Sequence, residues 1–568
     1  MKRLERLWRE LYGKTDKLFD NLMEHLRREK EEYSNDFPTV KRDWYKESVI
    51  YSLYVDLFNR NVDGLVDKLP HLEKLGVNCL WLLPVLESPM KDAGFDISNY
   101  RSIRPDILNL PEDSTQAERN EKFAQFLKKA HERGIRVIFD IALNHCSDEH
   151  PWFLEAKQSR DNPKRNFFIW SDTDQKYSEA RIIFKGLSKS NWEWEPETGQ
   201  YFFHRFFDIQ PDLNYKNPEV LAEMTKVLIF WKTKGLDGFR ADAIPYLWKE
   251  EGTDCENLEK THTIVKFFRA ALDYMEEGTL LLAEACQPPK KVVEYFGDND
   301  ECNAAYHFPV MPRIYRSLAE ESNEAVKMAL SPSFTPSDIP PDCQWLMFLR
   351  CHDELTLEMV TPQEREFIFN YYAKDPKWNF REGEGIASRL SDLFDNDLNR
   401  IKLAYSIEFS LLGTPIIYYG DEFGKRNDEA YYREMIEKTG IKDSRYLNRG
   451  RIDWESVEQE LGNENSQASK LYHFLSQLNA VRKEHPVLGR GHLEFMTVQD
   501  DEGNEIKEIL AYKRVAGDDC VTVFQNLSNR EISFKEPALA GRETDIPGNT
   551  IEKKEDRVVL APYHFYWV

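Results

Sequence analysis

Three features are scarce in this 568-residue sequence, and each scarcity excludes a class of protein. Basic residues are outnumbered, because 76 Lys and Arg face 99 Asp and Glu, which gives a formal charge of −23 and a pI near 5.2. Nucleic acids and anionic membranes attract clustered Lys and Arg, so this balance argues against both as partners. Uncharged apolar runs of roughly 18 to 20 residues, which a membrane-spanning helix needs, are also missing.

Cysteine is scarce as well. The chain has eight Cys, and none of them shows the paired CxxC spacing of a metal or redox motif. We therefore expect reduced thiols, no bound cofactor and no structural disulfide. The first residues, MKRLERLWRELYGKTDKLF, lack the apolar segment of a secretory signal, which predicts a cytoplasmic protein.

What the sequence does have is an alternation of strand-sized apolar runs and helix-like segments. Such alternation, with Gly at helix ends, is typical of parallel strands joined by helices. Seven or eight such units predict an α/β protein whose core is a (β/α)₈ TIM barrel, with a catalytic barrel domain over 45–487. The expected strands lie within 49–58, 77–85, 135–143, 235–244, 279–285, 343–351 and 414–420.

Three further segments accompany the predicted barrel. Helical spacing of apolar residues at the start predicts an N-terminal helical segment over 1–44, which we interpret as a packing element rather than a partner-binding arm. The aromatic-rich stretch 146–214 is too long for a barrel connection, so it predicts an excursion domain after the third strand. Short alternating runs over 488–568 predict a C-terminal antiparallel β domain.

Charged and polar side chains end four of the apolar runs. In a parallel barrel these positions meet at one rim, where catalytic residues collect. Two or three carboxylates that converge there with an Arg and His residues suit glycosidic bond chemistry, in which one carboxylate attacks the anomeric carbon and a protonated one assists the leaving oxygen. The residues in question are Asp140, Asn144, His145, Arg240, Asp242, Glu284, His352 and Asp353.

These residues stand in motifs that resemble those of the α-amylase superfamily, glycoside hydrolase family 13. The motifs are DIALNH, GFRADA, LLAEA and RCHDE, with QPDLN at 210–214 and GTPIIYYGDE at 413–422. The resemblance implies that Asp242 is the nucleophile, Glu284 the general acid/base and Asp353 the carboxylate that stabilises the distorted sugar. It also implies that Arg240 holds the nucleophile and that His145 and His352 contact the glucosyl unit.

The alternating spacing agrees with these roles. Arg240 lies two residues before Asp242 on a strand, so both side chains point to the same face and the guanidinium can orient the carboxylate. Glu284 lies between two alanines after a leucine run, an apolar setting that raises the pKa of a carboxyl group as a proton donor requires.

Within the superfamily, different stretches of the sequence resemble two different groups of enzymes. SDTDQKYSEARIIF, GQYFFHRFFDIQPDLNY and DECNAAYHFPVMPR resemble trehalose synthases, whereas YVDLFNRNVDGLVDKLPHLEKLG and LWKEEGTDCENLEKTH resemble amylosucrases. We therefore expect a retaining enzyme that acts on small-molecule α-glucosides, with trehalose synthase-like transfer and competing hydrolysis. Alternatives are a sucrose-using glucosyltransferase or sucrose hydrolase, an exo-acting α-glucosidase, and an inactive sugar-binding subunit. The oligomeric state stays open.

The resemblance also implies a set of substrate-binding residues around the catalytic carboxylates. Asp92 and Arg445 match a pair that closes the pocket floor in amylosucrases, and Phe95 takes the place of a stacking Tyr. Arg181, Glu354 and Arg400 match positions on the acceptor side. Cys286 replaces an Asn or an aliphatic residue in the leaving-group subsite, and Cys351 replaces an Asn. A thiol is a weak hydrogen-bonding group, so Cys286 favours escape of the leaving sugar and hydrolysis.

The sequence lacks a complete set of ligands for either of the two calcium sites that the resemblance to trehalose synthases suggests. The loop FNRNVDGL is too short for the acidic calcium loop of trehalose synthases. At a second calcium position Asn144 and Asp212 match, but Lys249 stands where a Glu is expected. Because an ammonium group can fill the same place and repels Ca²⁺, we predict no metal requirement.

Overall fold

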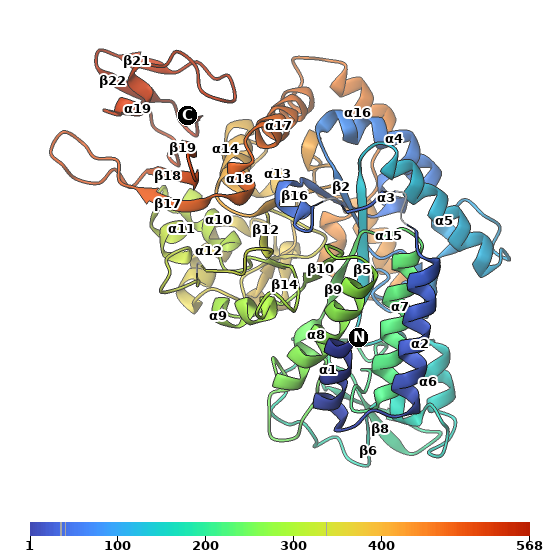
Figure 1. The fold of residues 1–568 in the computed structure, drawn as a ribbon. Coiled ribbons are helices and arrows are strands. Elements are labelled where there is room, and N and C mark those ends of the chain that lie inside the picture. Colours follow the sequence, from blue (N-terminus) through green and yellow to red (C-terminus); the bar gives the residue numbers. More distant parts are fainter. Residues whose placement is uncertain (35–36, 40, 337) are drawn as a thin grey trace.

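A closed barrel of parallel strands lies at the centre of the fold (Figure 1). The computed structural model describes residues 1–34, 37–39, 41–336 and 338–568. The strands close in the order β1-β16-β12-β11-β10-β9-β5-β2, which confirms the predicted (β/α)₈ barrel. They are β1 (Ile50–Leu53), β2 (Cys79–Leu82), β5 (Arg136–Ala142), β9 (Gly238–Asp242), β10 (Leu280–Ala283), β11 (Ala304–Tyr306), β12 (Gln344–Phe348) and β16 (Thr414–Tyr418).

Two details of the strands differ from the prediction. The first apolar run, 49–58, is not one strand, because β1 ends at Leu53 and Val55–Asn59 form the short helix α3. A run that is buried on all sides has no distinguishing period, so strand and helix look alike in sequence. The sixth barrel strand, β11, was not singled out, since its three residues are too short to form an apolar run.

Helices join the barrel strands and cover them. They are α4 (Val62–Leu75), α5 (Gln116–His131), α7 (Pro218–Thr233), α8 (Glu259–Met275), α9 (Pro289–Val292), α10 (Met311–Glu320), α11 (Glu324–Ala329), α14 (Leu398–Ser410), α17 (Gln467–Glu484) and α18 (Val487–Arg490). Local signals set their ends: Thr115 and Glu118 form a capping box at the start of α5, and Gly76, with φ 94°, ends α4. Among the described residues, none of these helices combines the length and the apolar character that a membrane crossing needs.

The N-terminal segment folds as two amphipathic helices, α1 (Lys2–Tyr12) and α2 (Lys17–Glu32). Helix α1 packs on α8 and α2 packs on α7, beside the barrel (Figure 1). Their apolar faces are buried, with Trp8 and Leu22 fully inaccessible. These contacts are those of a packing element. Residues 35, 36 and 40 of the predicted 1–44 segment lie outside the described residues.

Two insertions rise from the carboxyl ends of the barrel strands. The first follows β5 and contains α6 (Pro151–Ala156) and the antiparallel sheet β6 (Trp170–Ser171), β8 (Gln200–Phe203) and β7 (Trp192–Glu195). The second follows β12 and contains the sheet β13 (Leu355–Thr356), β15 (Gly385–Ile386) and β14 (Asn379–Phe380), with α12 (Pro362–Tyr372) and α13 (Leu390–Leu393). The sequence pointed to the first insertion and not to the second.

Smaller elements complete the rim. They are the hairpin β3 (Leu86–Glu87) and β4 (Asn99–Ile103) after β2, and α15 (Glu429–Thr439) and α16 (Trp454–Leu461) after β16. The connection between α15 and α16 includes a 3₁₀ turn over Ser444–Asn448. This turn carries Arg445 to the site, far along the chain from the strands.

The C-terminal region consists of two antiparallel sheets. One contains β17 (His492–Met496), β18 (Ile509–Ala516), β19 (Asp519–Asn526) and β23 (Phe565–Trp567), and the other contains β20 (Ile532–Phe534), β22 (Arg557–Leu560) and β21 (Glu552–Lys554), next to α19 (Pro537–Ala540). The antiparallel character matches the expected C-terminal sheet. The boundaries proposed for the segments stay predictions.

Candidate active site

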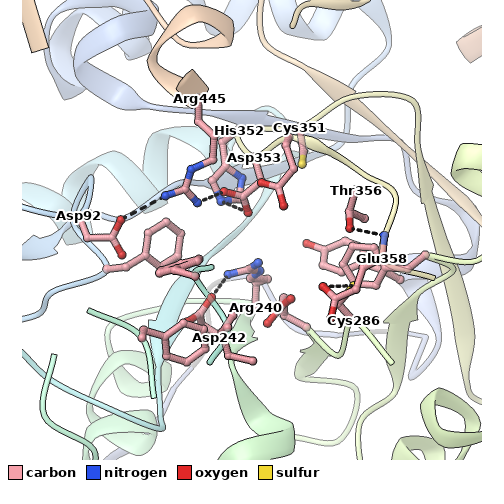
Figure 2. Close-up of a pocket in the computed structure, with 18 of the residues that line it drawn as sticks. Asp92, Arg240, Asp242, Cys286, Cys351, His352, Asp353, Thr356, Glu358 and Arg445 are labelled. Atoms are coloured by element: carbon pink, nitrogen blue, oxygen red, sulfur yellow. Dashed lines mark hydrogen bonds and ion pairs between the residues drawn. The ribbon is translucent and has the colours of Figure 1, made fainter. Parts of the chain in front are cut away.

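The predicted catalytic carboxylates meet in one pocket at the carboxyl ends of the barrel strands (Figure 2). Asp242 is the last residue of β9, Glu284 directly follows β10, and Asp353 lies in the loop after β12. All three line the pocket, although they are separated by up to 111 positions in sequence (353 − 242). The barrel brings them together because neighbouring parallel strands end at the same rim.

Arg240 connects the nucleophile candidate to the barrel interior. Its Nη1 donates to Asp242 Oδ1 at 2.5 Å and to Asp140 Oδ1 at 2.9 Å. The β5–β9 register places Asp140 beside Arg240, and Trp81 Nε1 donates to the second oxygen of Asp140 at 2.8 Å. Arg240 is thus held on one side and orients Asp242 on the other, as the spacing of the two residues indicated.

Glu284 is held by the backbone that follows Asp242. The Ala243 N–H donates to Glu284 Oε2 at 3.0 Å, and Ala243 adopts the left-handed conformation with φ 57°. A non-glycine residue in this region is uncommon and costs free energy, so it persists where the surroundings enforce it. Here the conformation turns one N–H group toward the second carboxyl group of the site.

Burial raises the pKa values of Asp242 and Glu284 to different extents. It raises the pKa of Asp242 to about 6, even though Arg240 lowers it, and raises the pKa of Glu284 to about 7, with Arg240 opposing and Asp242 adding to the rise. The group with the lower pKa loses its proton first. At a pH between these values Asp242 is an anion and Glu284 carries the proton, which is the division of roles that a retaining glycosidase needs.

Asp353 is the third carboxylate, and its surroundings keep it ionised. Its Oδ2 lies 3.1 Å from His352 Nε2, and its Oδ1 accepts from Arg445 Nη1 at 2.9 Å (Figure 2). Burial would raise the pKa of Asp353, but His352 and Arg445 outweigh it and hold this pKa well below its usual range. A permanent anion at this position can stabilise positive charge that develops on a sugar ring.

One side of the pocket is closed by the residues that the amylosucrase resemblance indicated. Arg445 Nη2 lies 3.7 Å from Asp92 Oδ1, and Asp92 Oδ2 accepts from Gln210 Nε2 at 2.9 Å. Phe95 stacks on the His352 ring, with centroids 5.4 Å apart, and His145 also lines this side. The ion pair and the stacked rings form this end of the pocket.

The opposite side of the pocket is formed by the insertion after β12. Glu354, Thr356, Glu358 and Arg381 line it, together with Cys286 from the loop after β10. Arg381 Nη2 donates to Glu358 Oε2 at 2.6 Å, and Cys286 Sγ lies 4.0 Å from the same oxygen. Burial raises the pKa of Cys286 well above its usual value, so this thiol stays protonated at neutral pH.

Sequence reasoning missed part of this wall. Arg381 lies outside every motif, and Glu358 was not singled out although it lies only five residues after Asp353, in a stretch that resembles trehalose synthases. Several apolar and aromatic residues that line other parts of the pocket were likewise not singled out, because such residues ordinarily belong to the core. These are Trp81, Ile183, Phe184, Phe206, Tyr246, Tyr306, Phe308 and Phe348.

Two predicted acceptor-side residues do not line the pocket. Arg181 lies behind the wall, where it forms an ion pair with Glu358 and donates from Nε to Glu256 Oε1 at 2.8 Å. Arg400 is on α14, and its guanidinium lies over the rings of Phe394 and Tyr563. These contacts place Arg400 beside the C-terminal region, away from the residues that line the pocket, so the acceptor-side roles of Arg181 and Arg400 stay predictions.

Lys249 lies where the sequence placed it, between two oxygen-bearing side chains. Its Nζ donates to Asn144 Oδ1 at 2.6 Å and pairs with Asp212 Oδ2 at 2.8 Å, and all three residues are buried. Burial lowers the pKa of Lys249, while Asp212 opposes this change. The ammonium group occupies the space between the two oxygens, and a divalent cation beside it would be repelled.

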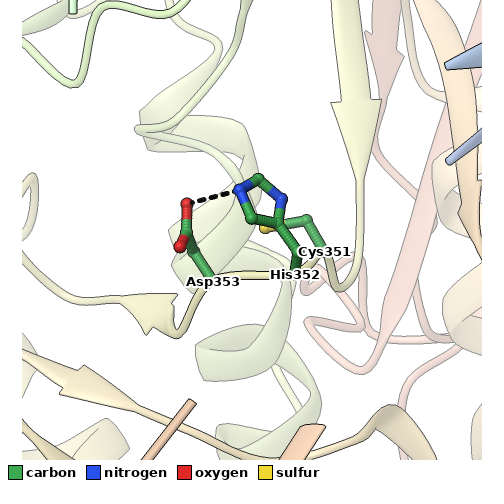
Figure 3. A group of neighbouring side chains, drawn as sticks. All are labelled: Cys351, His352 and Asp353. Atoms are coloured by element: carbon green, nitrogen blue, oxygen red, sulfur yellow. Dashed lines mark ion pairs between the residues drawn. The ribbon is translucent and has the colours of Figure 1, made fainter. Parts of the chain in front are cut away.

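Cys351, His352 and Asp353 form the one group of His, Cys and acidic side chains, among the described residues, that is compact enough to hold a metal ion (Figure 3). Their possible ligand atoms all lie within 4.8 Å of one another. The surroundings do not suit a cation, however. Arg445 already neutralises Asp353, and burial raises the pKa of Cys351 to about 12, which keeps the thiol protonated.

Comparison with known proteins agrees with this geometry. The family model described as alpha amylase, catalytic domain, matches residues 57–491. A trehalose synthase/amylase of Mycobacterium tuberculosis is 40% identical over 516 residues, covering 85% of this chain and 82% of the relative. A trehalose synthase of Pimelobacter sp. is 39% identical over 569 residues, covering 92% of this chain and 95% of the relative.

Solved structures agree in fold. The crystal structure of an alpha-amylase from H. orenii superposes with a TM-score of 0.69 at 22% identity, covering 92% of this chain and 99% of that chain. At that identity the likeness concerns the fold. The family model and the relatives go further, and they show that the chain belongs to the α-amylase family and is a glycoside hydrolase or transglycosylase.

Proposed function

We propose that this enzyme transfers glucosyl units of small α-glucosides with retention, in the manner of a trehalose synthase, and that hydrolysis competes with transfer. One observation carries the proposal. Asp242, Glu284 and Asp353 converge in a buried pocket whose glucose-binding side is closed by Asp92 and Arg445. The names of the relatives that are about 40% identical support a disaccharide of glucose as the substrate.

The chemistry follows from the positions of the groups. Asp242 attacks the anomeric carbon and forms a β-glucosyl ester, while Glu284 gives its proton to the glycosidic oxygen, so that the leaving sugar departs as a neutral alcohol. In the second half Glu284 takes the proton of an incoming hydroxyl, and that oxygen displaces Asp242. If the incoming oxygen is the anomeric hydroxyl of the glucose just released, the product is trehalose; if it is water, the product is glucose.

Cys286 supports the proposal that part of the glucosyl units is transferred to water. Its thiol faces Glu358 at 4.0 Å and offers a leaving sugar at most a weak hydrogen bond. A neutral hydrogen bond is worth roughly 0.5 to 1.5 kcal/mol, which corresponds to about two- to tenfold in retention of the leaving sugar. The variant Cys286→Asn would therefore raise the ratio of trehalose to glucose formed from maltose by that factor.

The test is to incubate the enzyme separately with maltose, trehalose, sucrose and isomaltose and to identify the products by chromatography. Interconversion of maltose and trehalose with some free glucose is the expected result, with glucose first released as the α anomer. Preferential use of sucrose would favour the amylosucrase-like alternative. Hydrolysis without transfer would favour an exo-acting α-glucosidase, and no turnover of any α-glucoside would leave a sugar-binding role.

A further inference from the structure

The side chain of Arg381 stands in the pocket wall on an unusual stretch of backbone. Arg381, Glu382 and Gly383 have φ values of 51°, 54° and 94°, so three consecutive residues adopt positive φ. Only glycine does so without strain. The turn is closed by Asn379 Oδ1, which accepts from the Gly383 N–H at 2.8 Å, and by the Arg381 carbonyl, which accepts from the Glu384 N–H at 3.1 Å.

This turn directs a long cationic side chain inward. The Arg381 side chain is only 7% exposed, and its Nη2 donates to Glu358 Oε2 at 2.6 Å and to Glu384 Oε2 at 3.3 Å. A surface turn would leave an arginine in solvent, where it needs no strained backbone. The strained backbone of 381–383 thus coincides with a buried guanidinium group.

Part of the guanidinium remains available. Within the part of the chain that the structure describes, Arg381 Nη1 makes no hydrogen bond, and it lies 3.6 Å from Glu354 Oε1. This separation is too long for a direct hydrogen bond. A sugar hydroxyl that accepts from Nη1 and donates to Glu354 would satisfy both groups. Both residues line the pocket on the side away from Asp92.

Glu354 is also held in place, in its case by packing against Gly385. A side chain at Gly385 would meet the Glu354 Cγ at 2.3 Å, so Glu354 packs directly on the backbone of β15. Glu358 is held between Arg181 and Arg381. The charges on this wall thus alternate and are already compensated, which favours a neutral hydroxylated sugar over an anionic one such as a sugar phosphate.

We propose that Arg381 is a specificity-determining residue of this enzyme, which holds the released glucose between Nη1 and Glu354 so that the sugar returns to the glucosyl-enzyme before water does. The proposal rests on the function proposed above. It adds a residue that none of the sequence motifs contains, and it assigns a purpose to the left-handed turn over 381–383.

The test compares Arg381→Met and Arg381→Lys with the wild type and with Lys185→Met. Lys185 is a suitable control because it pairs with Glu384, as Arg381 does, but does not line the pocket. Three quantities are measured: the ratio of trehalose to glucose formed from maltose, the inhibition constant of free glucose, and the consumption of α-glucosyl fluoride, which needs little help from the leaving-group side.

We expect Arg381→Met to lower the trehalose-to-glucose ratio and to weaken glucose inhibition, each by about tenfold, because a hydrogen bond to a charged group is lost. Consumption of α-glucosyl fluoride should stay within about twofold, Arg381→Lys should recover part of the loss, and Lys185→Met should resemble the wild type.

Two results would overturn the assignment of Arg381: unchanged ratio and inhibition constant in Arg381→Met, or an equal loss with α-glucosyl fluoride, which would mean that the residue supports the whole pocket. Failure of the proposed function is a different result, because the wild type would then form no trehalose from maltose. The glucose inhibition constant, measured against α-glucosyl fluoride, still tests Arg381 in an enzyme that hydrolyses without transfer.

Discussion

At the scale of single residues, the division of labour between Asp242 and Glu284 makes the sharpest prediction. Glu284→Ala removes the proton donor but leaves the nucleophile and its Arg240 contact in place. We expect turnover of maltose to fall by about 10³-fold, within the range attributed to general acid catalysis. Turnover of α-glucosyl fluoride should fall much less in its first step, since fluoride leaves without a proton.

The matched variant is Asp242→Ala, which removes the nucleophile. This variant should lose its activity toward both substrates equally, because no glucosyl-enzyme forms. Initial rates for the two substrates, followed by released glucose and fluoride, distinguish the two patterns. The roles assigned to the two carboxyl groups would be wrong if Glu284→Ala lost activity toward both substrates to the same extent. They would also be wrong if Asp242→Ala kept activity toward either substrate.

The pH dependence of the reaction follows from the same pair. Activity needs Asp242 without its proton, so kcat/KM should rise as pH increases through about 6, the pKa of Asp242. It also needs Glu284 with its proton, so kcat/KM should fall as pH increases through about 7, the pKa of Glu284. The expected profile for maltose is a narrow bell with its maximum between these values.

A variant identifies the falling limb of this profile. In Glu284→Gln, assayed on its residual turnover of maltose, the limb near pH 7 should disappear because an amide does not titrate there, while the rising limb near pH 6 stays. A wild-type profile that is flat from pH 5 to 8, or a falling limb that persists in the variant, would show that another group controls it.

At the scale of structural elements, Lys249 connects the loop after β9 to Asn144 after β5 and to Asp212 at the end of the first insertion. Since its ammonium group fills the space between their oxygens, EDTA should change neither the activity nor the melting temperature of the wild type. Lys249→Met leaves Asp212 as an unpaired buried anion, and we expect a loss of about 3–5 kcal/mol in the free energy of unfolding.

Calcium provides the control for this interpretation. Lys249→Glu supplies a third oxygen ligand, so Ca²⁺ should raise the melting temperature of this variant and leave that of the wild type unchanged. Differential scanning fluorimetry with and without Ca²⁺ makes the comparison. A wild-type melting temperature that falls in EDTA and returns with Ca²⁺ would contradict the role given to Lys249.

At the scale of the whole molecule, the pocket is bounded at both ends. Asp92 and Arg445 close one end, and Glu358 with Arg181 and Arg381 joins the two insertions at the other. A longer glucan must displace at least one of these ion pairs. We therefore expect kcat/KM to fall by at least about tenfold from maltose to maltotetraose, equivalent to about 1.4 kcal/mol, and activity on starch to be lower still.

Initial rates on maltose, maltotriose, maltotetraose and soluble starch, at equal concentrations of non-reducing ends, measure this dependence. Trehalose serves as a second disaccharide control, because it has the same size but a different linkage. Rates that increase with chain length would show that the ends of the pocket open readily and would favour a polymer-cutting amylase.

What the sequence by itself determined is local. Apolar runs and helix ends predict the barrel, because burial and capping leave a mark on consecutive residues. The carboxylates Asp242, Glu284 and Asp353 could be selected for the same reason, since a charged residue at the end of a buried strand is costly unless it is used. The position of Lys249 could be predicted only from the resemblance to trehalose synthases, because Lys249 stands where their second calcium site has a Glu.

The tertiary structure alone decided the rest of the pocket. Arg381 looks like a surface charge in the sequence, and only the insertion after β12 turns it inward, toward Glu358. Arg400 looked like a pocket residue, yet α14 directs it toward Phe394 and Tyr563. The physical reason is that a side chain's role depends on which loops fold over the barrel rim, and these contacts join residues that are far apart in the chain and leave no local pattern.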